Sequence, residues 1–269
     1  MTTSPDTWVY GDFAPDPASR DLPGLKARWL QAELPAAAAP RVLDYGVGEG
    51  KYLHLVRKIK PAAHLVGVDV RAPHSVPDFE FHQVAGDSAL PFAANTYDLV
   101  ISCDVLEHVE SIDQSLDDIH RVLRSGGSFI GFVPAEGGLG PYAFFRFLNP
   151  RIYQETKDHR HAYTRSDLLN RFSARFRIVK LAYSYHLLGA TLDAVFFAAF
   201  KLPILGSKLE GFWRGQENDV YRTSATPGAR RSLASRLIGV ANRAAYFEST
   251  MLRNIPLGAK GLHFHLQKL

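Results

Sequence analysis

Cysteine is almost absent from this 269-residue sequence, which holds one, Cys103. A single cysteine excludes an internal disulfide and fits a reducing compartment. Because Cys103 closes a stretch that we expect to be a buried strand, a packed thiol is a better interpretation than a nucleophile. We expect no signal peptide, since no basic patch followed by an apolar run opens the chain. The longest apolar stretch, 187–200, is shorter than the about 20 residues that cross a bilayer. We therefore expect a cytoplasmic protein.

Charge is unevenly distributed along the chain, although the net value is only +4. Residues 201–269 hold eleven Lys and Arg against four Asp and Glu, and residues 1–200 carry a small negative balance. Such an excess can mark a polyanion or membrane partner, whereas a solvated basic face is the commoner case. The charge distribution alone therefore does not identify a binding partner.

Glycines cluster in residues 41–50, RVLDYGVGEG, the stretch around which the rest of the chain is organised. Apolar residues, a glycine cluster and the following KYLHLVRKI predict a buried strand, a tight turn and a helix. Glycine permits a sharp turn and a close approach to a ligand, because it has no Cβ. The dinucleotide-binding pattern GxGxxG does not fit, since its third glycine position falls on Lys51. This spacing disfavours a nicotinamide dehydrogenase.

The pattern that does fit is acid-x-G-x-G-x-G, headed by Asp44. It resembles motif I of the class I S-adenosylmethionine-dependent methyltransferases. Four further segments resemble that family in the same order, so the likeness covers about residues 38–135. They are HLVGVD ending at Asp69, Gly86-Asp87-Ser88, LPFAANTYDLVISCDVLEHV at 90–109, and HRVLRSGGSFIGFVP at 120–134. The branch that this combination resembles contains quinone, lipid and natural-product methyltransferases.

The resemblance implies S-adenosyl-L-methionine as the cofactor. It places Asp69 on the ribose hydroxyls, where a doubly wound fold also puts an acid about 20 residues after the glycine turn. It places Asp87 on the adenine amino group. The full set of cofactor-binding residues carried over is Asp44, Gly46, Gly48, Gly50, Asp69, Val70, Gly86, Asp87, Ser88, Cys103, Asp104, Val105 and His108.

Strands and helices alternate in the cofactor-binding half. Alternation predicts an α/β fold with a parallel sheet covered on both faces. Right-handed crossovers then bring all carboxyl ends of the strands to one edge, where ligands bind. The resemblance implies a doubly wound, seven-stranded, mostly parallel sheet of order 3-2-1-4-5-7-6 with helical cap insertions. We expect strands at 41–45, 64–69, 79–84, 97–103, 127–133, 176–185 and 261–269, and helices at 25–34, 51–59, 112–123 and 165–172, the last with Ser166 as N-cap.

This plan divides the chain into a core and two insertions. Residues 1–37 form an arm and a helix, and 38–135 form the cofactor-binding core. The core sheet is completed by 163–186 and 259–269. The insertions are 136–162 and 187–258. In the family's topology both leave the carboxyl edge of the sheet, so we expect them to build the acceptor pocket.

Both insertions are rich in apolar residues, including PYAFFRFLNPRIY and LLGATLDAVFFAAF. In the second, apolar residues recur at alternating four- and three-residue steps, which predicts one stripe along a helix. The stripe suits a helix packed on the core, and it also suits an apolar lid, a dimer surface or a face resting on a membrane with arginines at the headgroups. Its members are Leu233, Leu237, Val240, Ala244, Phe247 and Met251.

Methyl transfer from a sulfonium needs chiefly proximity and alignment. An acceptor hydroxyl also has to lose a proton, and a histidine can take it near neutral pH. Candidate bases are His108, which can equally shape the methionine end of the pocket, and the pair His159 and His161. Three tyrosines in the first insertion or beside it can orient an acceptor: Tyr142, Tyr153 and Tyr163. No metal is expected, because no Asp-Asn pair of the catechol methyltransferase type follows the fifth strand.

These features favour a methyltransferase acting on an apolar small-molecule or lipid-like acceptor, at oxygen. A nucleic-acid or protein methyltransferase is the alternative, but the place of its (N/D)PPY tetrapeptide reads Cys103-Asp104-Val105-Leu106. A catalytically silent partner protein of the same fold is a third interpretation, against which the intact glycines and acids argue. We expect no nucleic-acid partner, and leave open a homodimer and peripheral contact with a membrane.

Overall fold

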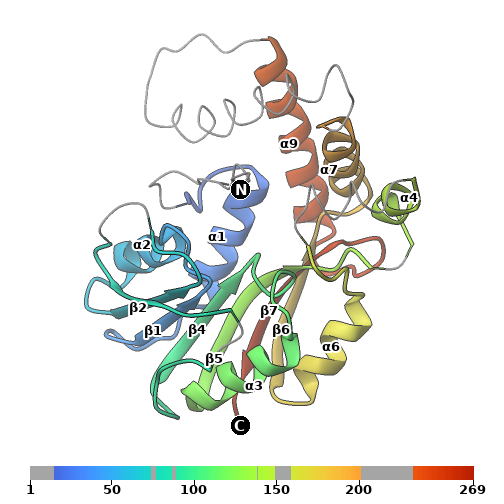
Figure 1. Cartoon of the computed structure of the whole chain (residues 1–269). Coiled ribbons are helices and arrows are strands. Elements are labelled where there is room, and N and C mark those ends of the chain that lie inside the picture. The colour runs from blue at the N-terminus through green and yellow to red at the C-terminus, as the bar shows by residue number, and fades with distance from the viewer. Residues whose placement is uncertain (1–14, 74–76, 87–88, 138, 149–158, 201–232) are drawn as a thin grey trace, which may run out of the picture.

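The computed structural model describes residues 15–73, 77–86, 89–137, 139–148, 159–200 and 233–269 (Figure 1). A seven-stranded sheet runs through its centre in the order β3-β2-β1-β4-β5-β7-β6, which confirms the fold predicted from the sequence. Strands β1 to β5 are parallel, and β7 runs antiparallel to both β5 and β6. The strands are β1 Arg41–Tyr45, β2 His64–Asp69, β3 Glu80–Gln83, β4 Tyr97–Cys103, β5 Leu123–Pro134, β6 Arg177–Ser184 and β7 Gly261–Gln267.

Helices cover both faces of this sheet because successive strand side chains alternate between them. Leu99 and Ile101 of β4 pack with α1 (Leu22–Glu33) and α2 (Lys51–Ile59). Val100 packs on the other face with α3 (Ile112–Val122) and α6 (Arg165–Ser173). All three β4 side chains are fully buried, so the central strands are apolar on both faces, as parallel sheets require.

The two insertions leave the same edge of the sheet as the glycine turn. Strand β6 is antiparallel to β7, which is antiparallel to β5, so β5 and β6 both end at the carboxyl edge. Helices α4, α7 and α9 stand beside that edge (Figure 1). Glu248 of α9 accepts hydrogen bonds from the first-turn amides of Leu188 and Gly189, at 2.8 and 2.9 Å, and so ties α9 to α7. The bounds are α4 Pro141–Leu148, α7 Leu187–Phe200 and α9 Leu233–Met251.

Two local predictions were wrong. The N-cap of α6 is Thr164, whose hydroxyl accepts from the Asp167 amide while the Asp167 carboxylate accepts from the Thr164 amide. This reciprocal capping box satisfies two backbone donors, which Ser166, one residue inside the helix, cannot do. The interpretation of the α9 stripe as a core-packing face was also wrong. Phe247 is 52% exposed and Met251 81%, and the buried face of α9 carries Ala245, Tyr246 and Ser249.

Among the described residues, no helix has both the length and the apolar character needed to cross a membrane. The predicted domain boundaries stay predictions. Tyr153, and the Leu233 and Leu237 side chains of the stripe, lie outside what the structure describes.

Candidate functional site

The glycine turn after β1 leaves a space on one side of Gly48. Gly48 has φ +51°, and a Cβ placed there would meet nothing within 4 Å. A Cβ on Gly46 would instead clash with the Val105 side chain, and one on Gly50 with Phe79. The three glycines therefore differ in role: Gly46 and Gly50 let neighbouring side chains pack closely, and Gly48 borders open space at the carboxyl edge of the sheet.

Asp69, at the end of β2, holds this turn in place. Its Oδ2 accepts a hydrogen bond from the Gly48 amide at 2.9 Å, and its Oδ1 accepts from the Arg71 amide at 3.1 Å. The amides of Gly46 and Val47 also donate to the Val68 carbonyl, at 2.9 and 3.0 Å. The turn is thus fixed to the neighbouring strand, with a carboxylate beside the open side of Gly48.

Asp44 is a buried carboxylate on β1, directly before the turn. It is 1% exposed, and its Oδ2 has no hydrogen-bond partner among the described residues. Burial raises the pKa of Asp44 to about 7, and Lys51 lowers it only in part. A buried carboxylate without a partner is costly, so its retention needs a reason. A positively charged ligand at the turn would provide one.

Because the pKa of Asp44 is raised, we expect the substitution Asp44→Asn to increase the stability of the fold by an amount that depends on pH. Since the folded pKa of about 7 exceeds the ordinary 3.8, the unfolded state loses this proton first, and stability falls as pH rises between those values. Each pKa unit is worth about 1.4 kcal/mol, so the ionised group costs the fold roughly 4 kcal/mol. Thermal unfolding should show Asp44→Asn to be the more stable protein at pH 8. That advantage should shrink toward pH 4; one that does not change with pH would contradict this account.

Lys26 of α1 occupies the same edge and neutralises Asp104. Its Nζ lies 2.7 and 2.6 Å from the two Asp104 carboxylate oxygens and 3.9 Å from the centre of the Phe132 ring. Burial alone would raise the pKa of Asp104, but Lys26 and then Lys51 outweigh burial and hold that pKa below its usual value. Asp104 is therefore an ionised, paired carboxylate.

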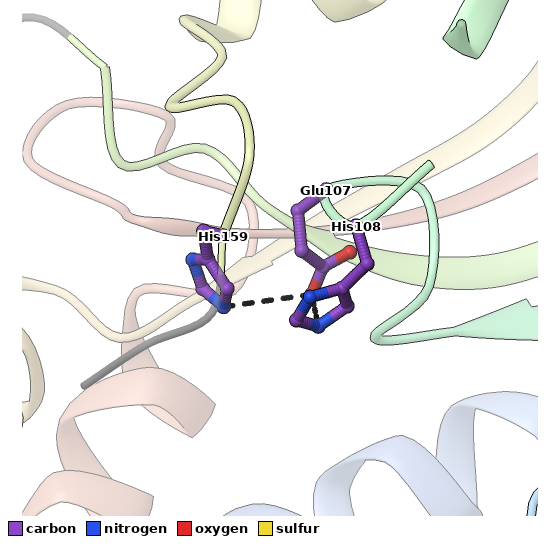
Figure 2. A group of neighbouring side chains, drawn as sticks. All are labelled: Glu107, His108 and His159. Atoms are coloured by element: carbon purple, nitrogen blue, oxygen red, sulfur yellow. Dashed lines mark ion pairs between the residues drawn. The ribbon is translucent and has the colours of Figure 1, made fainter. Parts of the chain in front are cut away.

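Two of the three predicted histidines meet around a buried acid, Glu107 (Figure 2). The Nε2 atoms of His108 and His159 each lie 3.9 Å from Glu107 Oε1. Glu107 is 1% exposed, and neither of its carboxylate oxygens has a hydrogen-bond partner among the described residues. Burial raises its pKa to about 8, and the nearby His159 lowers it in part. The other ring nitrogen of His159, Nδ1, lies 3.1 Å from the carboxylate of Glu136, which is 3% exposed.

The third predicted histidine, His161, lies apart from this cluster. Its Nε2 is 3.3 Å from the Glu110 carbonyl oxygen, and its backbone amide donates to the Glu107 carbonyl.

The other predicted site residues differ in exposure. Burial raises the pKa of the Cys103 thiol to about 12, so this thiol stays protonated. Val70 is 49% exposed at the end of β2, and Tyr142 and Tyr163 are buried. Gly86 has φ +52° with open space around it, whereas Asp87 and Ser88 lie outside the described residues.

Sequence reasoning missed three charged residues of this edge, namely Lys26, Glu107 and Glu136. Glu107 had a usable signal, because it stands beside His108 in DVLEHV, directly after a strand expected to be buried. Lys26 and Glu136 had none, since they come from the first helix and from the loop after β5. Only the folded chain brings them next to Asp104 and His159.

Comparison with known proteins agrees with this geometry. Residues 43–131 match the family described as "Methyltransferase domain". A demethylmenaquinone methyltransferase of Roseiflexus castenholzii is 33% identical over 115 residues, 39% of this chain and 48% of that protein. The mitochondrial protein of Rattus norvegicus called "Arginine-hydroxylase NDUFAF5" is 28% identical over 130 residues, 42% of this chain and 37% of that protein. The chain thus spans about half, or less, of the length of the curated relatives it matches.

A solved structure extends the likeness of fold to nearly the whole chain. Geranyl diphosphate C-methyltransferase from Streptomyces coelicolor A3(2), solved with Mg²⁺, geranyl diphosphate and S-adenosyl-L-homocysteine, superposes with a TM-score of 0.54 at 12% identity. The match covers 92% of this chain and 79% of that one. Residues 43–131 thus match a methyltransferase-domain family, and the solved structure shares its fold with nearly the whole chain.

Proposed function

We propose that the protein transfers a methyl group from S-adenosylmethionine to a hydroxyl of an apolar, lipid-like small molecule. The observation that supports the transfer is the carboxyl-edge site, where open space at Gly48 lies beside the Asp69 carboxylate and the buried Asp44 directly precedes the turn. When bound, S-adenosylmethionine supplies a methyl group on a positively charged sulfur, which leaves as a neutral thioether. The family match to residues 43–131 supports this proposal.

The described residues fit that cofactor on two independent grounds. The buried and unpartnered Asp44 Oδ2 suits a ligand that carries cationic groups. The space at Gly48 suits a ligand that lies against the backbone, because any side chain would fill it. Asp69 would accept the ribose hydroxyls while it holds the turn. Alignment of the two reactants is then the main contribution of the protein.

The apolar character of the acceptor is supported by the cap. Phe144 and Phe147 of α4 are 66% and 84% exposed, and Leu187 and Leu188 of α7 are 69% and 41% exposed. Together with Phe247 of α9 they place large exposed apolar side chains on each of the described helices α4, α7 and α9. Such a concentration is unusual on a soluble surface and marks a place for an apolar ligand or a lipid surface.

Oxygen as the attacked atom is supported by the cluster at Glu107. A hydroxyl is a poor nucleophile until its proton is lost, whereas a carboxylate acceptor needs no such help. Glu107, His108 and His159 are the titratable side chains that meet beside the post-β4 loop. The demethylmenaquinone methyltransferases among the relatives have a quinone-type acceptor in their name, so hydroxylated quinone precursors are the first acceptors to test.

The double variant Phe144→Ser, Phe147→Ser tests the cap. Losing this apolar contact should weaken the binding free energy of an apolar acceptor by about 1–2 kcal/mol, which raises its KM roughly 5- to 30-fold. Cofactor affinity should not change. Transfer of radiolabelled methyl to a hydroxylated quinone, a phospholipid vesicle and a mixed RNA sample would be compared. Val179→Ser, on β6 and 45% exposed, is the matched control. Methyl uptake by RNA alone would overturn the proposed acceptor class.

A further inference from the structure

The Glu107 cluster differs from an ordinary set of surface histidines. Glu107 is 1% exposed, and both of its carboxylate oxygens lack a hydrogen-bond partner among the described residues. A buried carboxylate needs a partner in either protonation state, since the ionised form needs donors and the neutral form needs an acceptor. The ring nitrogens Nε2 of His108 and His159 each lie 3.9 Å from its Oε1, too far for hydrogen bonds.

These distances are those of ligands arranged around one ion. The three donor atoms of Glu107, His108 and His159 all lie within 4.8 Å of one another. Metal–nitrogen and metal–oxygen bonds of about 2.1 Å place two ligand atoms up to about 4.2 Å apart, so a small closing movement suffices. Figure 2 shows both imidazoles turned toward the same carboxylate, from the loop after β4 and from the segment before α6.

Glu136 supplies the outer support that metal-bound histidines commonly have. Its carboxylate lies 3.1 Å from Nδ1 of His159, so an Nδ1–H donates to it and leaves Nε2, the atom nearer Glu107, with a free lone pair. A carboxylate behind a histidine ligand fixes the tautomer and the ring orientation. Both Glu107 and Glu136 are closed off from solvent, whereas the side chain of His108 is 37% exposed. The cluster is therefore enclosed on the protein side and open on one other side.

We infer that Glu107, His108 and His159 form a binding site for one divalent first-row transition-metal ion. Two imidazoles and one carboxylate suit Zn²⁺, Mn²⁺, Fe²⁺ or Co²⁺ better than Mg²⁺ or Ca²⁺, which prefer oxygen ligands. Asp104 is not a ligand, because Lys26 occupies both of its oxygens. From the sequence we expected no metal, because no Asp-Asn pair follows β5. The ligand set inferred here consists of other residues, in the loop after β4 and before α6.

An ion with three protein ligands keeps positions open for a further ligand. A hydroxyl of the methyl acceptor could take one, and its proton would then pass to solvent more readily, because a cation lowers the pKa of the oxygen that it binds. This chemical role rests on the proposed methyl transfer. The binding site itself does not, so the two can be tested separately.

The test is a titration of the untagged, chelator-treated full chain with Co²⁺, with and without S-adenosylhomocysteine. Visible absorption bands report nitrogen and oxygen ligation, and competition with Zn²⁺ gives the relative affinity. We expect one Co²⁺ per chain, and a loss of affinity of roughly 100-fold or more in Glu107→Gln, His108→Ala and His159→Ala. Glu136→Gln should weaken binding about 10- to 100-fold, the usual effect of an outer carboxylate.

His161→Ala is the matched control, since this histidine lies two positions from His159 but outside the cluster. It should bind Co²⁺ as the wild type does. Thermal unfolding checks each variant, and Co²⁺ should raise the melting temperature of the wild type but not of Glu107→Gln, which preserves the shape of the site. No saturable Co²⁺ binding under either condition, or equal binding by all variants, would overturn the inference. Binding through these residues without methyl transfer supports the site and counts against the proposed function.

Discussion

Gly48→Val should abolish binding of S-adenosylmethionine and S-adenosylhomocysteine while leaving the sheet intact. Gly48 has φ +51° and open space at the position of a Cβ, so a valine side chain would project into the volume assigned to the cofactor. A β-branched residue is also strained at a positive φ, which moves the backbone that Asp69 holds. We expect affinity to fall by at least about 100-fold, equivalent to roughly 3 kcal/mol. Calorimetric titration with S-adenosylhomocysteine measures the change.

Gly126→Val separates the effect on the site from the effect of backbone strain. Gly126 has φ +75° and open space around its Cβ position, but it lies near the start of β5, at the opposite edge of the sheet. Its conformational cost should resemble that of Gly48→Val, while its cofactor affinity should equal that of the wild type. Similar losses of affinity in both variants would mean that strain, and not occupation of the site, is responsible.

Asp69→Ala has the second largest expected effect on cofactor binding. The carboxylate accepts from the Gly48 amide at 2.9 Å, so alanine removes an anchor of the turn together with the acceptor proposed for the ribose hydroxyls. Hydrogen bonds to a charged group are worth about 1.5–3 kcal/mol, which predicts a loss of affinity of about 10- to 100-fold. Asp69→Asn keeps one acceptor oxygen, so its affinity for S-adenosylhomocysteine should lie between that of Asp69→Ala and that of the wild type.

Asp78→Ala is the control for removing a carboxylate near the second strand. Asp78 is 57% exposed and pairs only loosely with His54, at 3.3 Å. It should bind S-adenosylhomocysteine normally, and its melting temperature should match that of the wild type. If Asp69→Ala bound the cofactor as tightly as Asp78→Ala does, the ribose site would lie elsewhere.

The parts of the fold that sequence predicts well are those decided by local patterns. The glycine turn, the acid at the end of β2 and the alternation of strands and helices each follow from neighbouring residues. Because the connections of a parallel sheet obey few topological rules, these elements also determine the carboxyl edge and most of the strand order. The same local patterns indicate Asp44, Gly48 and Asp69.

What sequence could not predict depends on contacts between distant segments. The ion pair of Lys26 with Asp104 joins positions 78 residues apart, and the Glu136–His159 contact joins two ends of an insertion. Periodicity shows that the α9 helix has an apolar face, but not whether that face meets the protein, so the sequence could not decide between core packing and an exposed stripe. The smaller residues of the other face, with Tyr246, are the ones that pack.

Calorimetric titration of the wild-type protein with S-adenosylhomocysteine, with NADH as the comparison ligand, tests the central claim most directly. We expect saturable binding of one S-adenosylhomocysteine per chain, weakened as pH falls below about 7, where Asp44 takes up a proton. NADH should not bind, because the turn lacks the third glycine of the dinucleotide pattern. Binding of NADH alone, or of neither ligand, would contradict a methyltransferase site at this edge of the sheet.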